Sequence, residues 1–259
     1  MGFNRLKHLG SAFGLNPGKF GTSVIGSFKS LCSYYFNGVD SYASLGSHVN
    51  STIDGASTFS LRMVFKFVDI GTTQYLFTTK NATGYGIRFH RNAADNKLWV
   101  WFNSGSGNNV WSISGGFGDT DWHELIITYD TGTVNYYVDG SIMNSGTWVL
   151  GSSYPTSLAA STLPPILGSG NVSSGFGNSY INQIQVTSDI ITETEAGALW
   201  HSGEPLVGGD SLDNVEADYI FDNDSFDGTD WTLIDRTGNG NGITSNVNAV
   251  DKDCNENPY

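Results

Sequence analysis

Short apolar or alternating runs follow one another from residue 33 onward, and each run is closed by Gly, Asn or Asp. This pattern is typical of an antiparallel β protein, in which strands are separated by tight turns. The runs predict strands at residues 34–36, 59–67, 75–77, 85–89, 98–102, 125–129 and 134–138.

The clearest hairpin signal lies between residues 125 and 143. The runs 125–129 and 134–138 flank Asp130-Thr131-Gly132, a short loop whose glycine suits a left-handed bulge position. Asp139-Gly140 then predicts a second reversal into residues 141–143, because Asp and Gly accept a positive φ at little cost.

Only one segment has the pattern of a helix. Thr192 can cap it, and Glu195 stands three residues later, as a capping box requires. The helix near 192–201 is about two turns long. Strands alternating regularly with helices are therefore excluded, and a sandwich or jelly roll is favoured.

Composition supports a folded protein with an unusual surface. The 259 residues are 39% hydrophobic, which is enough for one large all-β domain or two small ones, but only 14% are charged. Ser, Thr, Asn and backbone must therefore make up much of the surface. The net charge of -13 argues against nucleic acid or an anionic membrane as a partner. No apolar run approaches the roughly 20 residues of a membrane-spanning helix, so no membrane insertion is expected.

The charge is unevenly placed along the chain. Residues 1–36 carry four basic residues and no acid, whereas residues 98–235 contain no Lys or Arg. The first residues do not form a signal peptide, because polar and basic residues interrupt every apolar run. Two interpretations of this Gly-rich arm stay open, a disordered terminus and a docking peptide that lies on an acidic neighbour. The basic residues of the arm are Arg5, Lys7, Lys19 and Lys29.

The two cysteines, Cys32 and Cys254, lie near opposite ends of the chain. A disulfide between them would close a very long loop and contribute about 4 to 5 kcal/mol in the chain-entropy model. Without a secretory signal, two free thiols are the expectation, with the disulfide as the alternative.

Three motifs in order resemble the concanavalin-A-like or laminin-G-like jelly-roll superfamily, which includes the pentraxins. Residues 35–42 (YFNGVDSY) resemble its opening strand and turn, and 122–140 resemble its central hairpin, from Trp122-His123 to Asp139-Gly140. Residues 166–168 and 181–186, with the short helix, resemble its closing strand and terminal helix. The resemblance covers residues 34–201 and implies an all-β, antiparallel jelly-roll sandwich.

The chain departs from the family pattern in its C-terminal part. Residues 217–221 and 235–241 resemble a segment that precedes the opening strand in the family, yet here they follow the closing helix. A second truncated copy, a circular permutation and a strand given to a neighbouring molecule are the alternatives. We expect a basic arm at 1–33, a jelly roll at 34–201, and an acidic extension at 202–259 that supplies a strand to its own or a neighbouring jelly roll, since about 50 residues cannot build another sandwich.

The sequence offers little for catalysis. Some members of the superfamily are glycosidases, which need two carboxylates held across the scissile bond. The closest pairs are Glu193 with Glu195, on the helix, and Glu216 with Asp218, and neither pair has the third acid of the family's Glu-x-Asp-x-Glu arrangement. His123 belongs to a Trp-His pair that is more often structural, and no Ser nucleophile motif is present.

Calcium is the one metal that the sequence suggests, because it takes oxygen ligands from acidic loops. Asp222, Asp224, Asp227 and Asp230 are dense enough to consider, but their spacing is not that of an EF-hand. A solvated acidic loop is the alternative, so no cofactor is expected other than Ca²⁺ at this loop.

The seven tryptophans raise the question of sugar binding. In residues 98–102 (LWVWF), the period of two puts Trp99 and Trp101 on one face of the strand and the aliphatic residues and Phe102 on the other. Trp99 and Trp101, with Trp111 nearby, could stack on sugar rings. Alternatively they pack beneath loops or a neighbouring subunit, as large aromatics usually do.

These observations favour a non-enzymatic structural or adhesion module. A docking-like arm and a tail suited to strand exchange suggest a virion surface component, such as a bacteriophage capsid decoration, head-fibre or tail protein. Its expected partners are other virion proteins through the arm, further copies of the chain in a homo-oligomer, and host-surface glycans. The alternatives are a secreted or cell-surface carbohydrate-binding adhesin and a glycoside hydrolase of the same fold.

Overall fold

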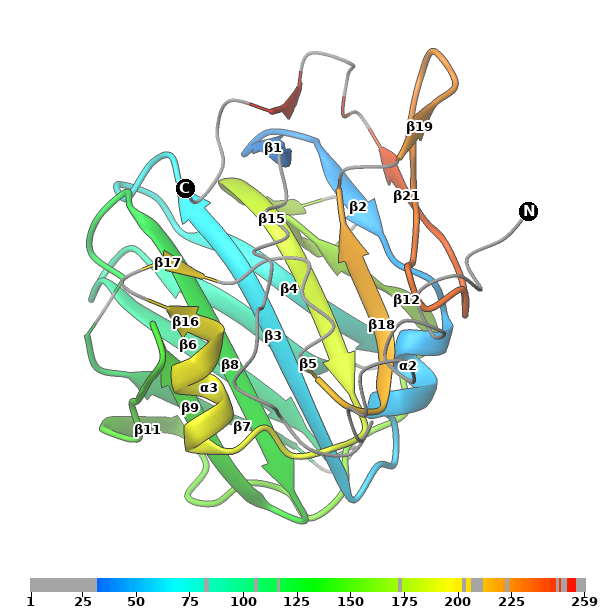
Figure 1. Ribbon diagram of the computed structural model, residues 1–259. Helices are drawn as coiled ribbons and strands as arrows, with labels where there is room; N and C mark the ends of the chain where they lie inside the picture. The colour runs from blue at the N-terminus through cyan, green and yellow to red at the C-terminus, as the bar shows by residue number, and fades with distance from the viewer. Residues whose placement is uncertain are drawn as a thin grey trace.

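The computed structural model describes residues 32–81, 84–104, 107–115, 117–171, 174–201, 204–205, 212–221, 224–245, 247 and 251–254. In these residues two large antiparallel sheets are stacked face to face, with two short helices packed against them (Figure 1). The all-β sandwich predicted from the strand pattern is confirmed. The predicted arm, with Arg5, Lys7, Lys19 and Lys29, lies outside the described residues.

One sheet has eight strands. It is built around the long strands that the alternating runs predicted, and β10 lies at one edge and β22 at the other. Its strands in spatial order are β10 (Ser141–Ile142), β9 (Thr133–Val138), β8 (Trp122–Asp130), β3 (Thr58–Phe67), β15 (Asn178–Thr187), β1 (Ser33–Asn37) and β22 (Lys252–Asp253), while β18 (Val215–Ile220) also pairs with β15.

The second sheet has ten strands and lies behind the first in Figure 1. Its order is β11 (Gly146–Leu150), β7 (Asn108–Ile113), β6 (Lys97–Asn103), β5 (Gly84–Asn92), β4 (Gln74–Asn81), β12 (Leu163–Leu167), β2 (Tyr42–Ser44), β21 (Gly242–Ser245), β20 (Trp231–Leu233) and β19 (Ser225–Phe226). Two small hairpins accompany the sandwich, β13 (Ser169–Asn171) with β14 (Ser174–Phe176) and β16 (Trp200–His201) with β17 (Glu204–Pro205).

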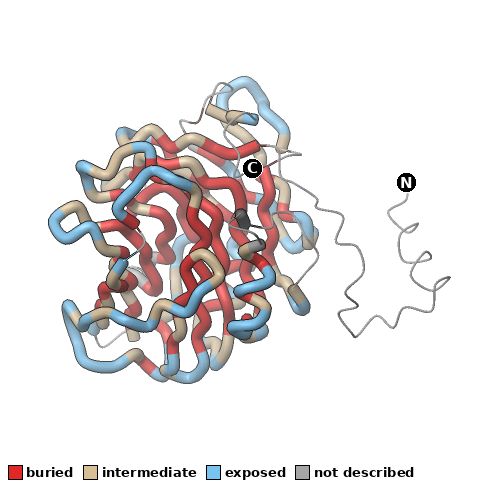
Figure 2. Tube along the Cα trace, turned by 60° about the vertical axis from the view of Figure 1, so that its left-hand side comes forward, coloured by how far each residue is buried: buried red, intermediate tan, exposed pale blue. Residues whose placement is uncertain are grey.

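The core lies between the two sheets, where Figure 2 shows the buried stretches of chain. Alternate residues of β3 face it, and Phe59, Leu61 and Phe65 are fully buried there. Leu98, Val100 and Phe102 of β6 face them from the second sheet. Each such side chain contributes about 1.5 to 3 kcal/mol by leaving water, so rows such as these two, with the other core residues, hold the sheets together.

The first strand and a strand of the C-terminal part share one edge of β15. β1 pairs with residues 178–181 of β15, and β18 pairs with residues 183–187 of the same strand. Further along the tail, β21 pairs with β2 in the ten-stranded sheet. Strands from the C-terminal part therefore complete both sheets within the same chain. The predicted domain boundaries at 33/34 and 201/202 stay a prediction.

The two cysteines are bonded to each other, which differs from the state expected from the sequence. Cys32 and Cys254 form a disulfide, so the expectation of free thiols is wrong. The reason is the pairing of β22 with β1, in which Ser33 lies opposite Asp253 and places the two cysteines side by side. Because that pairing joins the two ends of the chain, no local pattern in the sequence indicates it.

The predicted helix is α3 (Glu193–Leu199), and its capping box is confirmed. The Thr192 hydroxyl accepts a bond from the Glu195 amide, and the Glu195 carboxylate accepts one from the Thr192 amide. Leu199 packs on Ile126 of β8 and Tyr137 of β9, which places α3 on the outer face of the eight-stranded sheet (Figure 1).

A second helix, α2 (His48–Ile53), was not predicted from the sequence. It is only six residues long and includes the β-branched residues Val49, Thr52 and Ile53, which weaken the helical signal. Val49 and Ile53 are buried, so tertiary packing of one face holds this helix in place.

The turns of the central hairpins agree with the predicted chemistry, with one difference. Asp139 and Gly140 both have positive φ, as expected. The preceding loop has two residues rather than three, because Asp130 pairs with Thr133. Thr131 accepts a positive φ of 45° there, and its amide donates to the carbonyl of Ser57.

Candidate functional site

The outer face of the ten-stranded sheet carries a group of large polar and aromatic side chains. On β6, Leu98, Val100 and Phe102 face the core, so Trp99 and Trp101 face outward. The period of two had predicted that the two tryptophans share one face of the strand, without saying which face lies outward. Both tryptophans are half-buried rather than buried. They are therefore available for contact from solvent, which a core position would not allow.

Cross-strand pairing brings three residues to these tryptophans. On β5, Arg88 lies opposite Trp101 and His90 lies opposite Trp99, and on β4 Tyr75 lies opposite His90. Facing residues of an antiparallel pair point to the same side of the sheet, so the five side chains form one group. We call Tyr75, Arg88, His90, Trp99 and Trp101 the outer-face aromatic patch.

The side chains of the patch stack against one another. The Tyr75 and His90 rings are stacked with centroids 5.1 Å apart, and the His90 ring meets Trp99 edge-on at 5.7 Å. The Arg88 guanidinium lies 4.0 Å from the centroid of Trp101 and 5.6 Å from that of Tyr75. Such cation–π contacts fix the guanidinium while the Trp101 ring keeps part of its surface exposed.

The patch contains a single cationic side chain, Arg88, in a protein whose net charge is -13. His90 is only 4% exposed, and burial, aided by the nearby Arg88 charge, lowers its pKa to about 3, so the imidazole is neutral at neutral pH. Arg88 is therefore the charged group of the patch. The Trp99 indole donates its Nε1 proton to Asp95 at 3.1 Å, which fixes the orientation of that ring.

The hairpin β13–β14 borders the patch on the Tyr75 side. Gly175 has a φ of +72°, and a Cβ atom there would lie 3.0 Å from the Tyr75 ring, so only glycine lets this hairpin approach so closely. Thr78 of β4 donates to the carbonyl of Ser169 in β13. The hairpin therefore covers part of β4 and leaves the side chains of β5 and β6 at its border.

Trp111 is not part of this patch. In the β6–β7 pair it lies opposite Val100, so it points to the inner face and packs against the core. Its ring meets Trp148 at 5.0 Å, near the open edge of the sandwich. The sequence placed Trp111 near Trp99 and Trp101, but the structure separates them onto opposite faces of the sheet.

The acidic loop considered for calcium does not gather its carboxylates in the described residues. Asp222 lies outside them. Asp224 accepts hydrogen bonds from the Tyr34 hydroxyl (2.9 Å) and the Ile234 amide (2.8 Å), and Asp227 accepts bonds from the amides of its own turn. Within the residues described, no group of three His, Cys, Asp or Glu side chains could hold a metal ion.

The carboxylates considered for hydrolysis also have partners within the protein. Asp218 is buried and accepts hydrogen bonds from Gln183 (2.9 Å) and Arg236 (3.1 Å); burial raises its pKa, and these contacts only partly oppose the rise. Glu195 is used in the helix cap. His123 lies 2.9 Å from both Asp119 and Asp139, an arrangement that fixes the strand start where the sequence predicted a structural role.

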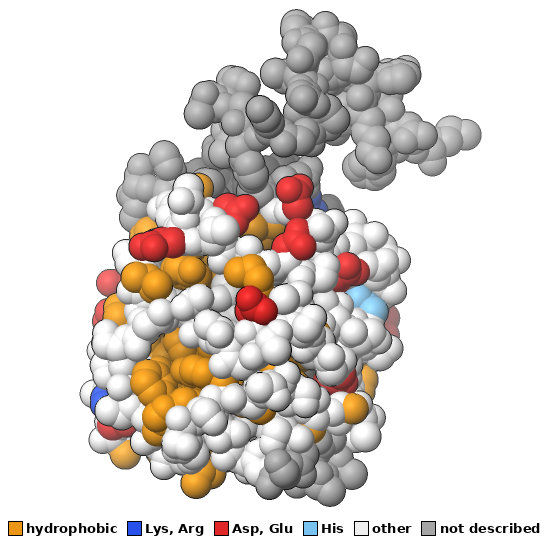
Figure 3. Space-filling model, turned by 90° about the horizontal axis from the view of Figure 1, so that it is seen from below, with side chains coloured by type: hydrophobic (Ala, Val, Ile, Leu, Met, Phe, Trp, Pro, Cys, Tyr) orange, Lys and Arg blue, Asp and Glu red, His pale blue; other side chains and the backbone are white. Residues whose placement is uncertain are grey.

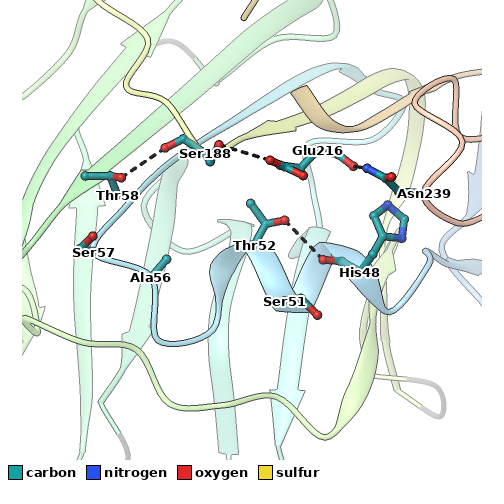
Figure 4. A pocket seen from close by; sticks show the side chains of 9 residues that line it. All are labelled: His48, Ser51, Thr52, Ala56, Ser57, Thr58, Ser188, Glu216 and Asn239. Atoms are coloured by element: carbon teal, nitrogen blue, oxygen red, sulfur yellow. Dashed lines mark hydrogen bonds between the residues drawn. The ribbon is translucent and has the colours of Figure 1, made fainter. Parts of the chain in front are cut away.

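One pocket escaped the sequence analysis altogether (Figure 4). It has a volume of about 540 Å³ and lies beside α2, where Ser188 donates to the Glu216 carboxylate at 3.3 Å and Asn239 donates to the Glu216 carbonyl at 2.9 Å. The His48 imidazole lies 2.9 Å from Asp235. Four distant segments line the pocket, so nothing local in the sequence indicates it: His48, Ser51, Thr52, Ala56, Ser57, Thr58, Ser188, Glu216 and Asn239.

Comparison with protein families decides the relationship suggested by the motifs. Residues 37–197, more than half of the chain, match the family model described as the concanavalin A-like lectin/glucanases superfamily. The chain belongs to this superfamily. The jelly-roll resemblance stated from the sequence is thereby confirmed, and the patch lies on one of the superfamily's two sheets. No curated protein matches the chain.

Solved structures agree on the fold. A putative carbohydrate binding protein from Bacteroides ovatus superposes with a TM-score of 0.60 at 17% identity, covering 84% of this chain and 58% of that one. This chain thus spans less than two thirds of that protein. Domains LG4–5 of the mouse laminin α1 chain match more weakly, with a TM-score of 0.46 at 13% identity, covering 64% of this chain and 44% of that one. The CBM40 of a Ruminococcus gnavus sialidase matches with a TM-score of 0.47 at 12% identity, covering 65% of this chain and 98% of that one. At such identities the likeness shows the fold alone.

Among the described residues, no helix is both long and apolar enough to cross a membrane.

Proposed function

We propose that the protein is a non-enzymatic carbohydrate-binding module that binds a glycan on its outer-face aromatic patch, at the cell surface or outside the cell. The observation that carries this proposal is the placement of Trp99 and Trp101, two half-buried tryptophans side by side on an outer sheet face. Nothing in the core requires aromatic side chains there, because Leu98, Val100 and Phe102 already fill the inner face.

The chemistry of the patch suits a sugar. The apolar C–H faces of a sugar ring pack on indole rings, and the sugar hydroxyls need polar partners beside them. Arg88 supplies hydrogen-bond donors against Trp101, and Asp95 supplies a carboxylate against Trp99. The stacking of Tyr75 on His90 and the bond to Asp95 hold the rings before a ligand arrives, which reduces the entropy cost of binding.

The same features favour binding over hydrolysis. Glycoside hydrolysis requires a pair of carboxylates across the scissile bond. Asp95, the carboxylate that contacts the patch, is engaged with the Trp99 indole. Membership of the lectin superfamily supports the carbohydrate-binding hypothesis better than the virion-surface one. The virion-surface role, the docking arm and the homo-oligomer stay predictions that rest on the sequence.

The test is a glycan array followed by calorimetry with the strongest ligand, using Trp99→Ala and Trp101→Ala with Trp101→Phe as the matched control. We expect each alanine variant to bind at least about tenfold more weakly, because buried aromatic anchors dominate binding energy. The phenylalanine variant keeps an apolar ring and should retain most of the affinity. An array without any signal, or alanine variants with unchanged affinity, would overturn the proposal.

A further inference from the structure

A hollow separate from the pocket beside α2 opens at the edge of the sandwich. It lies on the opposite face of the ten-stranded sheet from the outer-face aromatic patch. Trp148 of β11 lies opposite Trp111 of β7, and both face inward at the last two strands of the ten-stranded sheet. Tyr154, in the loop after β11, lies 4.7 Å from the Trp148 ring and 6.2 Å from the Trp111 ring. Figure 3 shows hydrophobic side chains gathered on the left of the view, the side on which β11 lies in Figure 1.

Polar groups line the hollow next to this aromatic wall. Its volume is about 470 Å³, within the range of small-molecule sites. Asn109, Ser153, Thr156 and Ser157 are among the residues that line it, and the side chains of these four have no hydrogen-bond partner in the part of the chain that the structure describes. We call this site the open-edge hollow; it is lined by Ser104, Asn109, Ser153, Tyr154, Pro155, Thr156 and Ser157.

The loop that forms the hollow is held in place from the core. Tyr129, which is buried, donates its hydroxyl proton to the carbonyl of Pro155 at 2.8 Å, and the Phe102 ring meets Tyr154 edge-on at 5.4 Å. Gly151 has a φ of +78°, and a Cβ atom there would overlap Asn109, so glycine lets the loop pass close to β7. The lining is therefore arranged before any ligand binds.

Tyr154 also keeps a free proton to donate. The Tyr136 hydroxyl donates to the Tyr154 oxygen at 3.1 Å, which leaves the Tyr154 O–H available. Burial raises the pKa of Tyr154 to about 12, so the phenol stays neutral and protonated at every pH of interest.

No formal charge comes from the segments that build the hollow. Residues 98–118 and 140–188 contain no Asp, Glu, Lys or Arg, in a chain with a net charge of -13. Strands β7 and β11 and the loop at 151–158 all belong to these segments. A charged ligand would lose its hydration here without an opposite charge to compensate, whereas a neutral, hydroxyl-rich ligand would lose little.

We propose that the open-edge hollow is a second carbohydrate-binding site, which takes one neutral sugar residue. The sugar's C–H face packs against Tyr154, whose ring adjoins Trp148, and its hydroxyls bond to Asn109 and to the serine and threonine hydroxyls. This site goes beyond the proposed function of the outer-face aromatic patch. It differs from the patch in lacking a cation and in lying on the inner side of the sheet edge, and it does not depend on the patch.

The experiment uses the full chain labelled with 5-fluorotryptophan, with each ¹⁹F resonance assigned from a Trp→Phe variant. Glucose, galactose, mannose and N-acetylglucosamine are titrated to about 50 mM, a range that detects millimolar affinity. We expect at least one of them to shift the Trp148 and Trp111 signals with saturation, and glucuronate to bind less tightly than glucose. Asn109→Ala should weaken this binding about five- to tenfold, the loss of one or two hydrogen bonds. Asn108→Ala, the same change at the next position, is the matched control and should bind like the parent.

Each outcome separates this site from the patch. Shifts at Trp148 and Trp111 alone support the second site and count against the patch. Shifts at Trp99 and Trp101 alone overturn the second site and leave the proposed function standing. No shift with any sugar counts against both. Glucuronate binding as tightly as glucose, or Asn109→Ala behaving like Asn108→Ala, would overturn the assignment of a neutral ligand to this lining.

Discussion

Cys32 and Cys254 are joined by a disulfide although 222 positions of sequence separate them. The bond adjoins the pairing of Ser33 with Asp253, so β1 and β22 are linked both by their backbone and covalently. Close by, the Lys252 ammonium lies 4.7 Å from the Trp231 ring centroid and 5.8 Å from that of Tyr34. The disulfide thus ties the end of the tail to the first strand of the sandwich.

Removing this disulfide should destabilise the protein strongly. For a loop of this length, the chain-entropy model gives a loss of about 5 kcal/mol in the free energy of unfolding. Urea unfolding of the Cys32→Ser/Cys254→Ser variant against the parent measures it. The parent treated with reductant should match the variant, and the variant should not respond to reductant. Equal stability of the oxidised and reduced parent would contradict the prediction.

Arg62 and Glu124 form a buried ion pair that should be sensitive to the loss of either partner. Arg62 donates to Glu124 at 2.6 Å and to Gln185 at 2.8 Å, and the two charged residues are 1% and 0% exposed. Burial raises the pKa of Glu124 even beside the guanidinium. Arg62→Met leaves the carboxylate without its partner and should cost about 3 to 5 kcal/mol of unfolding free energy.

The control for this pair is the double variant Arg62→Met/Glu124→Leu, which removes both charges. It should be more stable than Arg62→Met alone, because no unpaired buried charge remains. Chemical denaturation of the parent, the single variants Arg62→Met and Glu124→Leu, and the double variant gives the coupling. A double variant that loses the sum of the two single losses would show that the two residues act independently.

His123 should make stability depend on pH on the alkaline side. Burial opposes protonation of its ring, but the hydrogen bonds and charges of Asp139 and Asp119 outweigh burial and raise its pKa. The stabilisation is therefore complete below about pH 6.5, the ordinary histidine pKa, and is lost as the pH rises through the folded-state value. Unfolding free energies from pH 5 to 9 should fall more steeply for the parent than for His123→Gln. Asp121→Asn, which changes a nearby charge without contacting His123, should keep the parent's slope.

His90 should have the opposite effect, on the acid side. Burial, then the charge of Arg88, lowers its pKa to about 3. In the unfolded chain the imidazole becomes protonated near pH 6.5, whereas in the folded protein it stays neutral until the pH is much lower. Stability is thus lost as the pH falls from about 6.5 toward 3, by up to about 1.4 kcal/mol per pH unit. His90→Phe keeps a ring in the stack and should remove this part of the acid sensitivity in melts between pH 4 and 7. An unchanged acid profile would show that His90 titrates normally.

Alternation and turn chemistry explain which parts of the molecule could be predicted. The alternation at 98–102 was enough to place Trp99 and Trp101 together on one face of the strand, and Thr192 with Glu195 was enough to place a helix start. Asp139-Gly140 marked its turn because the backbone there has positive φ at both positions. These are local effects, each set within a few residues.

The partners of those residues could not be predicted, because they depend on register between strands. Arg88 reaches Trp101 only through the β5–β6 pairing, and Trp111 turns inward because it lies opposite Val100. Tyr154 reaches Trp148 from a loop with no strand pattern of its own. A shift of one residue in either pairing would send these side chains to the other face.

The sequence by itself determined the fold class, the superfamily motifs, the main strands and the shared face of Trp99 and Trp101. Only the tertiary structure decided that the tail completes both sheets, that Cys32 meets Cys254, and that an uncharged hollow opens beside Trp148. The reason is physical. Alternation and turn preferences act over a few residues, whereas β18, β22 and the hollow arise from contacts between segments far apart in the chain, whose pairing is fixed only when the whole core is buried.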